Sequence, residues 1–198
     1  YGGLLLNSRL HANTANEAGG GVSCNANGTI NRCVITSNTA HCSLLDFGGG
    51  GVRLHQGGVV INSLVAANSA RLVGGGIYAQ DGGRIVNCTV AANTATNIGG
   101  IFFRDWGGSY DLEVVNSIAY DNANGNNNGG VYTYTCSTPV PAGEGNITNA
   151  PRFVAGLSND FRLASTSPCI DQGTNLPWLV NETDLDNSPR VMYGRVDM

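Results

Sequence analysis

Aromatic and basic side chains recur at matching places in several similar phrases of the chain, where they could contact sugars. The phrases "GVRLHQ", "GIYAQD" and "GIFFRD" each follow a run of glycines. Aromatic rings stack on sugar rings, and Arg and His can hold acidic groups. We therefore predict a glycan-binding strip made of Arg53, His55, Tyr78, Gln80, Phe102, Arg104, Trp106, Tyr132 and Tyr134. The alternative is that these aromatic residues only stabilise stacked strands.

A catalytic role for the strip has less support in the sequence. A glycosidase needs two carboxylates across the bond that it cleaves, and only Asp81 and Asp105 lie on the strip. A β-eliminating lyase needs a base, for which Arg53, His55 and Arg104 are the candidates. Neither a Gly-x-Ser-x-Gly nor a P-loop signature occurs. We expect a non-enzymatic module used for adhesion, glycan contact or structural spacing, with a lyase or hydrolase of an acidic polysaccharide as the alternative.

Metal and cofactor sites are not indicated by the residue spacing. Cys24, Cys33 and Cys42 are evenly spaced, without the paired Cys-x-x-Cys knuckles of structural zinc sites. The segment "TDLDNSPR" holds two acids and an Asn close together, but it lacks the ligand spacing of a known calcium loop. We expect an ordinary turn there, and no cofactor.

Five similar phrases recur along the chain and indicate the elements that must carry the strip. One Asn stands at the same place in each phrase, and the position six residues earlier is usually Asn as well. The first set is Asn13, Asn38, Asn68, Asn93 and Asn122, and the second is Asn7, Arg32, Asn62, Asn87 and Asn116. A period of about 25 residues, with β-branched residues in place of regularly spaced leucines, predicts a β-solenoid. The extra residues "HCSLLDFG" and "DWGGSYD" are expected to leave this scaffold as loops.

Alternation within each repeat predicts which side chains point inward. One inward column is Val22, Val52, Ile77, Ile101 and Val131. The strip residues alternate with such columns, so we expect them to point outward, with the loop of Asp105, Trp106 and Tyr110 overhanging the same wall. The two Asn columns are expected to lie at turns and to hydrogen-bond from one turn to the next.

The phrases "GGGIYAQ", "NCTVAANTA", "INSLVAANSA" and "VVNSIAYDN" resemble polymorphic outer membrane protein repeats. This resemblance implies an all-β, right-handed parallel β-helix of about six coils, with the pectin-lyase-like fold. It also implies an exported bacterial protein, secreted or held at the cell surface. We expect residues 1–135 to form the repeats and residues 136–198 to form the terminal coils and a C-terminal cap of the same domain. The ends at Tyr1 and Met198 suggest a piece of a longer protein.

Six cysteines leave many pairings open. Cys33 and Cys88 share a column but lie two turns apart, about 9.6 Å, which is beyond disulfide reach. Inward-pointing Cys24, Cys33 and Cys88 are expected to act as small buried residues. We hypothesise that Cys136 and Cys169, in the last coils, form a disulfide that caps that end.

The composition limits the partners of the chain. Only 12% of its 198 residues are charged, the net charge is −4, and no Lys/Arg cluster is present, so nucleic-acid binding is not expected. No apolar run approaches the ~20 residues that span a bilayer. The expected partner is a polysaccharide or cell-surface glycan. The alternative is other protein subunits, which could stack into a filament through unpaired strand edges at the solenoid ends.

Overall fold

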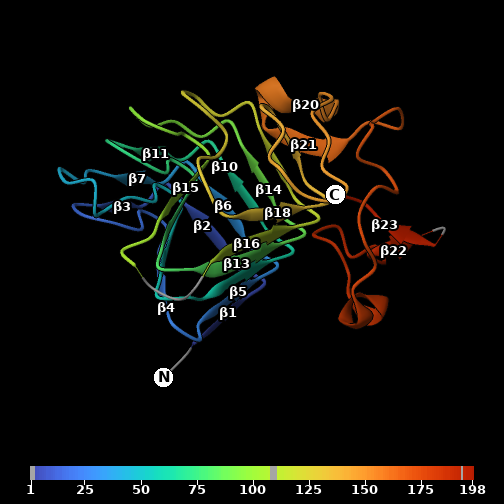
Figure 1. Ribbon diagram of the computed structural model, residues 1–198, viewed down its shortest axis with the longest axis horizontal. Helices are drawn as coiled ribbons and strands as arrows, with labels where there is room; N and C mark the ends of the chain where they lie inside the picture. The colour runs from blue at the N-terminus through green and yellow to red at the C-terminus, as the bar shows by residue number, and fades with distance from the viewer. Residues whose placement is uncertain (1–2, 108–110, 193) are drawn as a thin grey trace.

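The chain folds into a solenoid of short parallel strands (Figure 1). The computed structural model describes residues 3–107, 111–192 and 194–198. Within these residues, four parallel sheets run along the solenoid axis, and successive turns of the chain add successive strands to them. The two longest sheets each contain six strands. The prediction of an all-β parallel β-helix of about six coils is therefore confirmed.

The strands are only two to four residues long, because each turn of the solenoid must bend several times. The first sheet contains β1 (Leu4–Leu6), β5 (Thr29–Asn31), β9 (Val59–Ile61), β13 (Gly83–Val86), β16 (Leu112–Val115) and β18 (Val131–Thr133). The second contains β2 (Arg9–His11), β6 (Val34–Thr36), β10 (Leu64–Ala66), β14 (Thr89–Ala91), β17 (Ile118–Tyr120) and β19 (Cys136–Ser137). The third contains β4 (Val22–Asn25), β8 (Val52–His55), β12 (Ile77–Gln80) and β15 (Ile101–Arg104). The short fourth sheet contains β3 (Thr14–Ala15), β7 (Thr39–Ala40) and β11 (Ser69–Ala70).

Residues one repeat apart lie directly opposite one another in the sheets. Ile30 pairs with Leu5 and with Val60, and Ile77 pairs with Val52. Because strand side chains alternate between two faces, such columns either fill the interior or face outward. Ile77 has no exposed surface, and the column from Val22 to Ile101 is confirmed as inward.

One Asn column forms a continuous hydrogen-bonded ladder inside the turns. The side-chain nitrogen of Asn68 donates to Oδ1 of Asn93 at 3.0 Å and to the backbone oxygen of Ile35 at 2.9 Å. The same amide-to-amide bond joins Asn38 to Asn68 and Asn93 to Asn122. The predicted ladder is confirmed, and each interior Asn satisfies a backbone carbonyl that the turn would otherwise leave unpaired.

The other Asn column forms the predicted turns but only part of a ladder. Asn62 and Asn87 have φ angles of 50° and 52°, and Nδ2 of Asn87 donates to Oδ1 of Asn62 at 3.0 Å. Asn116 instead exchanges hydrogen bonds with the backbone of Thr174, and Arg32 donates to Oδ1 of Asn187. This column therefore also anchors the C-terminal segment.

The last coil departs from the predicted alignment. The sequence predicts Val131 in the inward column of the third sheet, but β18 joins the first sheet, where Tyr132 pairs with Val114. Tyr132 is buried in the core, and Val131 is exposed. Tyr134 takes a turn position at φ 49° and donates its hydroxyl to Glu144. The prediction that Tyr132 and Tyr134 belong to the outward strip is wrong.

The physical reason lies in the glycines that precede β18. The alignment treats Gly130 as the end of a glycine run before the third sheet. In the structure Gly130, at φ 102°, leads into β18 of the first sheet, as Gly58 at φ 97° leads into β9. Glycine serves the two kinds of turn for different reasons. Gly58 and Gly130 have positive φ angles that a Cβ disfavours, whereas a Cβ on Gly50, before the third sheet, would lie 2.4 Å from the oxygen of Gly75. Glycine runs alone therefore do not distinguish the two corners of the solenoid.

The C-terminal segment, residues 152–198, lies along the flank of the solenoid (Figure 1). Its elements are β20 (Phe153–Ala155), η1 (Gly156–Ser158), β21 (Asp160–Leu163), η2 (Pro177–Asn181), β22 (Val191–Met192) and β23 (Arg195–Val196). Phe161 packs on Ala66 and Ala91 of the second sheet. Arg190 donates to Oδ1 of Asn62 and to the backbone oxygen of Asn87. Most of the terminal region therefore covers a side of the solenoid.

The cysteines are free thiols and all six are buried. Cys24, Cys33 and Cys88 lie in the interior cluster, as predicted. Cys136 and Cys169 lie together in a separate cluster, where the Cys136 thiol donates to the backbone oxygen of Asn149 at 3.2 Å. The hypothesised disulfide is absent, but the two partners that it requires are neighbours.

Candidate functional site

The outward face of the third sheet carries six of the predicted strip residues in two columns. Tyr78 lies opposite Arg53 and Phe102, and Gln80 lies opposite His55 and Arg104. The Tyr78 and Phe102 rings stack with centroids 5.8 Å apart and planes inclined by 6°. The parallel register therefore places the aromatic and basic residues together, as the repeat predicted.

The loop "HCSLLDFG" folds over the centre of this face. A carboxylate oxygen of Asp46 lies 2.8 Å from a guanidinium nitrogen of Arg104, and the Arg53 guanidinium lies 5.8 Å from the centre of the Phe47 ring. Tyr78 is fully buried, and burial raises its pKa to about 12. The aromatic centre of the predicted strip is thus covered by the chain itself.

The basic side chains of the strip are engaged within the protein. Arg53 donates to Oε1 of Gln80 at 3.0 Å, and Arg104 also lies over the Trp106 ring at 4.3 Å. Burial, and then the charge of Arg53, lower the pKa of His55, which disfavours the charged form of its imidazole. These side chains therefore offer little free positive charge to an acidic ligand.

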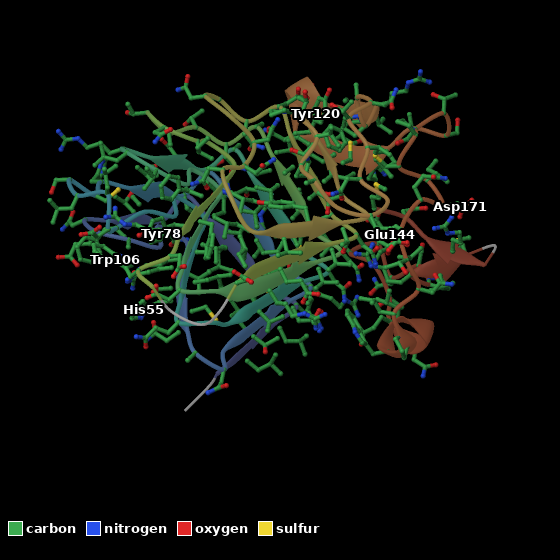
Figure 2. The ribbon with its side chains drawn as sticks, in the orientation of Figure 1. His55, Tyr78, Trp106, Tyr120, Glu144 and Asp171 are labelled. Atoms are coloured by element: carbon green, nitrogen blue, oxygen red, sulfur yellow. The ribbon has the colours of Figure 1, made fainter. Side chains whose placement is uncertain are left out.

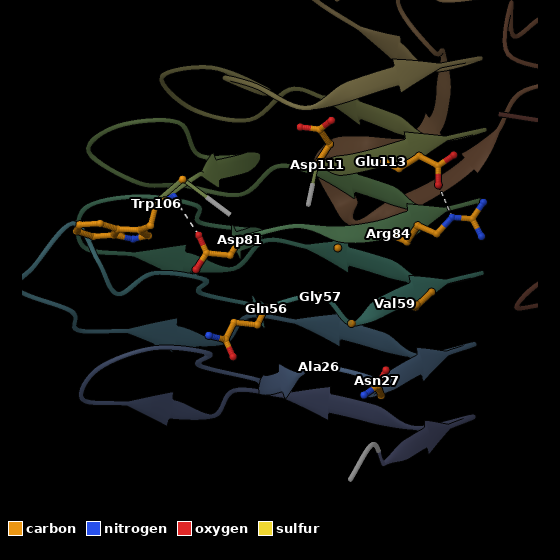
Figure 3. Close-up of a pocket in the computed structure, with 13 residues that line it drawn as sticks. Ala26, Asn27, Gln56, Gly57, Val59, Asp81, Arg84, Trp106, Asp111 and Glu113 are labelled. Carbon is orange, nitrogen blue, oxygen red and sulfur yellow. Dashed lines mark hydrogen bonds and ion pairs between the residues drawn. The ribbon is translucent and has the colours of Figure 1, made fainter. Parts of the chain in front are cut away.

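An open groove of about 880 Å³ runs beside this face, along the turns that join the third sheet to the first. Asn27, Gln56 and Asp81 line it on successive coils (Figure 3). All three have φ angles between 54° and 63°. Glycines follow Gln56 and Asp81. Because glycine has no side chain, the surface next to these two residues leaves space for the groove.

Trp106 lines the groove on the coil after that of Asp81 (Figure 3). Its backbone N–H donates to Oδ1 of Asp81 at 2.9 Å, and Arg104 stacks on its ring, yet 55% of the residue is exposed. His55, Tyr78 and Trp106 lie on one side of the molecule, away from Asp171 of the C-terminal segment (Figure 2). A held, exposed indole beside hydrogen-bonding side chains can stack on a sugar ring.

The groove is acidic overall. Among its described lining residues, the carboxylates of Asp81, Asp111 and Glu113 outnumber the guanidinium of Arg84, which forms an ion pair with Glu113 (Figure 3). Negative potential disfavours polyanions. Amide and carboxylate groups here can still exchange hydrogen bonds with the hydroxyls of an uncharged ligand.

Sequence reasoning found only part of this groove. It singled out Trp106 and Asp81, but it missed Gln56, Arg84 and Glu113. The signal was the pair of phrases "QGG" and "DGG" directly after the strands, since a polar residue followed by two glycines indicates a tight turn. The predicted overhang by Tyr110 lies outside the described residues.

Other chemistry is limited in the part of the chain that the structure describes. No three His, Cys, Asp or Glu side chains there gather as metal ligands. Oδ1 of Asp184 accepts the backbone N–H groups of Asp186 and Ser188 at 2.9 and 2.8 Å. The segment "TDLDNSPR" forms a turn that the Asp184 carboxylate holds. Within residues 3–107, 111–192 and 194–198, no helix has the length and apolarity needed to cross a bilayer.

Comparisons with known proteins find no match: no protein-family model, no curated protein and no solved structure is significantly similar to this chain. Functional inference therefore depends on the groove and on the covered face beside it.

Proposed function

We propose that this chain is an exported, non-enzymatic surface module that contacts a neutral glycan through the groove that Trp106 lines. The observation that carries the proposal is the exposed indole, held by Asp81 and Arg104, next to a hollow lined with polar side chains. Ligand sites typically combine an apolar contact surface with a few hydrogen-bonding groups that orient the ligand.

The stacking of coils favours an extended ligand. Asn27, Gln56 and Asp81 repeat along the axis, and the rise between strands is about 4.8 Å. A polymer lying along the groove would therefore meet a new polar side chain at every coil. A small, compact ligand would use only one of these positions.

Charge favours a neutral glycan over an acidic one. The alternative of a lyase or hydrolase for an acidic polysaccharide depends on Arg53, His55 and Arg104. Two of these are held by Gln80 and Asp46, and burial lowers the pKa of His55, which disfavours its charged form. A uronate would therefore approach an acidic groove without a free cation to neutralise it.

Export to the cell surface is part of the proposal. It is supported by the phrases that resemble polymorphic outer membrane protein repeats, such as "GGGIYAQ". Disulfides persist in oxidising compartments, so we expect the adjacent thiols of Cys136 and Cys169 to be joined in exported protein. Mass spectrometry of unreduced protein should find this pair linked and Cys33 and Cys88 free. Free thiols at both positions in exported protein would contradict this part of the proposal.

The binding test uses the two tryptophans of the chain. Trp106 lies at the groove, whereas Trp178 is partly exposed on η2 of the flank. On a glycan array with neutral and uronate polymers, we expect neutral chains to bind and Trp106→Ala to weaken binding by about 10-fold or more, given the 1–3 kcal/mol of a buried aromatic contact. Trp178→Ala is the matched control and should bind as the wild type does.

Product analysis then separates binding from turnover. Binding without new reducing ends or unsaturated sugars supports the non-enzymatic proposal. Stronger binding to uronates than to neutral chains, or turnover that disappears in His55→Ala, would instead support the enzymatic alternative. Equal loss in both tryptophan variants would remove the groove as the site.

A further inference from the structure

The loop that covers the third sheet, residues 42–47, is an addition to the repeat. The step from Asn38 to Asn68 is 30 residues, whereas the next step of the same column is 25. Among the described residues, the backbone of this loop forms no hydrogen bond to the solenoid; the N–H of Phe47 donates to the oxygen of Leu44 within the loop. The loop can therefore open without breaking the hydrogen bonds between strands.

The side chains of the loop do not complete the hydrophobic core. Leu44 and Leu45 are exposed, although leucine is among the residues that a core most often buries. The loop contacts the face through a charge instead, since Asp46 forms an ion pair with Arg104. The side chains of Arg104 and Asp46 are 29% and 41% exposed, so a ligand in solution can compete for this ion pair.

The covered face contains buried polar atoms that the loop does not satisfy. Within the described residues, Nε of Arg53 and the hydroxyl of Tyr78 are buried without a hydrogen-bond partner. Oδ1 of Asp46 lies 2.8 Å from a guanidinium nitrogen of Arg104, but this ion pair lacks hydrogen-bond geometry. Because unpaired buried groups cost free energy, a ligand that pairs them can compete with the loop.

The unpaired groups indicate which ligand the face suits when the loop is displaced. Guanidinium groups bind carboxylates in a two-pronged geometry, so Arg104 can take a ligand carboxylate in place of that of Asp46. Nε of Arg53 donates only, and the hydroxyl of Tyr78 donates or accepts, so both suit ligand hydroxyl groups. The Tyr78 hydroxyl lies within electrostatic range of both guanidiniums. A carboxylate and hydroxyl groups on one small ring are the chemistry of a uronate sugar.

We propose that residues 42–47 are a displaceable lid over a second binding site, which takes the carboxylate and hydroxyl groups of a uronate sugar. While the lid is closed, the Asp46 carboxylate stands in for that of the ligand. The site is separate from the groove, because the described residues that line the groove do not include Arg53, Tyr78 or Arg104. The proposal therefore does not depend on the binding of a neutral glycan there.

The first test removes the charge of the lid and keeps its length. The affinity of a mostly closed site is reduced by the fraction that is open, so Asp46→Asn should raise the affinity for an oligogalacturonate by about tenfold or more. Calorimetry on the full chain measures this gain, and a neutral oligosaccharide of equal length should show none. Asp186→Asn, which removes an exposed acid of the C-terminal segment, is the matched control and should bind as the wild type does. Adding Arg104→Gln to Asp46→Asn should remove the gain.

The second test follows the movement of the lid itself. Cys42 begins the lid and is a buried free thiol, so its rate of labelling by a maleimide reports opening. A ligand that binds only the open state increases the population of that state. We therefore expect both the oligogalacturonate and Asp46→Asn to speed the labelling of Cys42 several-fold. The interior thiols of Cys24, Cys33 and Cys88 should stay protected, which also shows that the variant is folded.

Four results would overturn the proposal. The first is an Asp46→Asn protein that gains neither uronate affinity nor Cys42 labelling. The second is an equal gain from Asp186→Asn or for the neutral oligosaccharide, which would assign the effect to net charge or to another surface. The third is a gain that persists when Arg104→Gln is added. The fourth is labelling of the interior thiols together with Cys42, which would mean that the loop opens only when the solenoid unfolds.

Discussion

The two ends of the solenoid are made from the same repeat, but the polar groups of their edge strands differ in whether side chains hydrogen-bond to them. At the end near β15, β18 and β19, amides of Asn126, Asn128 and Asn146 bond to the outermost rung. At the end of β1–β4, the inward leucines are partly exposed and the ladder acceptor of Asn13 receives no donor from the described residues. At the end near β15, β18 and β19, the solenoid is therefore closed by side chains that imitate the next rung.

The difference also concerns the interior. At the closed end Tyr132 fills the core above Val114, and its hydroxyl has no hydrogen-bond partner within the described residues. At the open end the same column ends in Leu5, which is smaller and partly exposed. Closing the core with a large ring thus leaves a buried hydroxyl without a hydrogen-bond partner among the described residues, which costs free energy.

The largest expected effect comes from interrupting the ladder in the middle instead of at its open end. Asn68 is buried, with two donated and two accepted hydrogen bonds, so Asn68→Ala should lower the free energy of unfolding by about 3–5 kcal/mol. Asn13→Ala, which is exposed, should lower it by less than about 1 kcal/mol. Urea unfolding followed by circular dichroism measures both. Equal losses would show that the end rung is as important as the interior.

A smaller effect is expected from removing a closing amide. Asn146→Ala leaves the N–H of Thr135 and the carbonyl of Tyr132 without their partner, and we expect a loss of about 1–3 kcal/mol. Hydrogen exchange should rise in β18 and β19 and stay unchanged in β1 and β2. If exchange rises equally at both ends, the closing amides do not act locally.

The smallest expected effect comes from the buried tyrosines. They should leave the free energy of unfolding unchanged at neutral pH and lower it in alkali. Burial raises the pKa of Tyr132 above its ordinary value and that of Tyr78 to about 12. An unfolded Tyr titrates near 10. Stability from the neutral hydroxyls is therefore complete below about pH 10 and is lost as pH rises toward the folded pKa, by about 1 kcal/mol per group at pH 11.

Two variants separate these contributions. Tyr132→Phe should reduce the alkaline loss and slow exchange in β18 at pH 11, and Tyr78→Phe should do the same near β12. Unfolding measured from pH 8 to 11 compares each with the wild type. An alkaline loss that persists unchanged in both variants would assign it to other groups.

Much of the scaffold could be predicted because each repeat places the same residue types at the same positions. Alternation gave the inward columns from Val22 to Ile101, and recurrence gave the ladder of Asn38, Asn68 and Asn93, both of which are present. The contacts of the candidate site were harder to predict from the sequence. The outward direction of Arg53 and its place near Gln80 follow from alternation and strand register, but its contact with Phe47 depends on a loop that no period describes.

The sequence by itself determined the solenoid, its columns and its Asn ladder, since each follows from local periodicity repeated at a fixed interval. Only the tertiary structure decided that "HCSLLDFG" covers Tyr78, that the terminal segment lies along the flank, and that Tyr132 turns inward. The physical reason is that glycine allows several kinds of corner equally well, and loops settle by contacts with residues distant in sequence. Which corner Gly130 makes, and which face a loop covers, are decided by packing between coils.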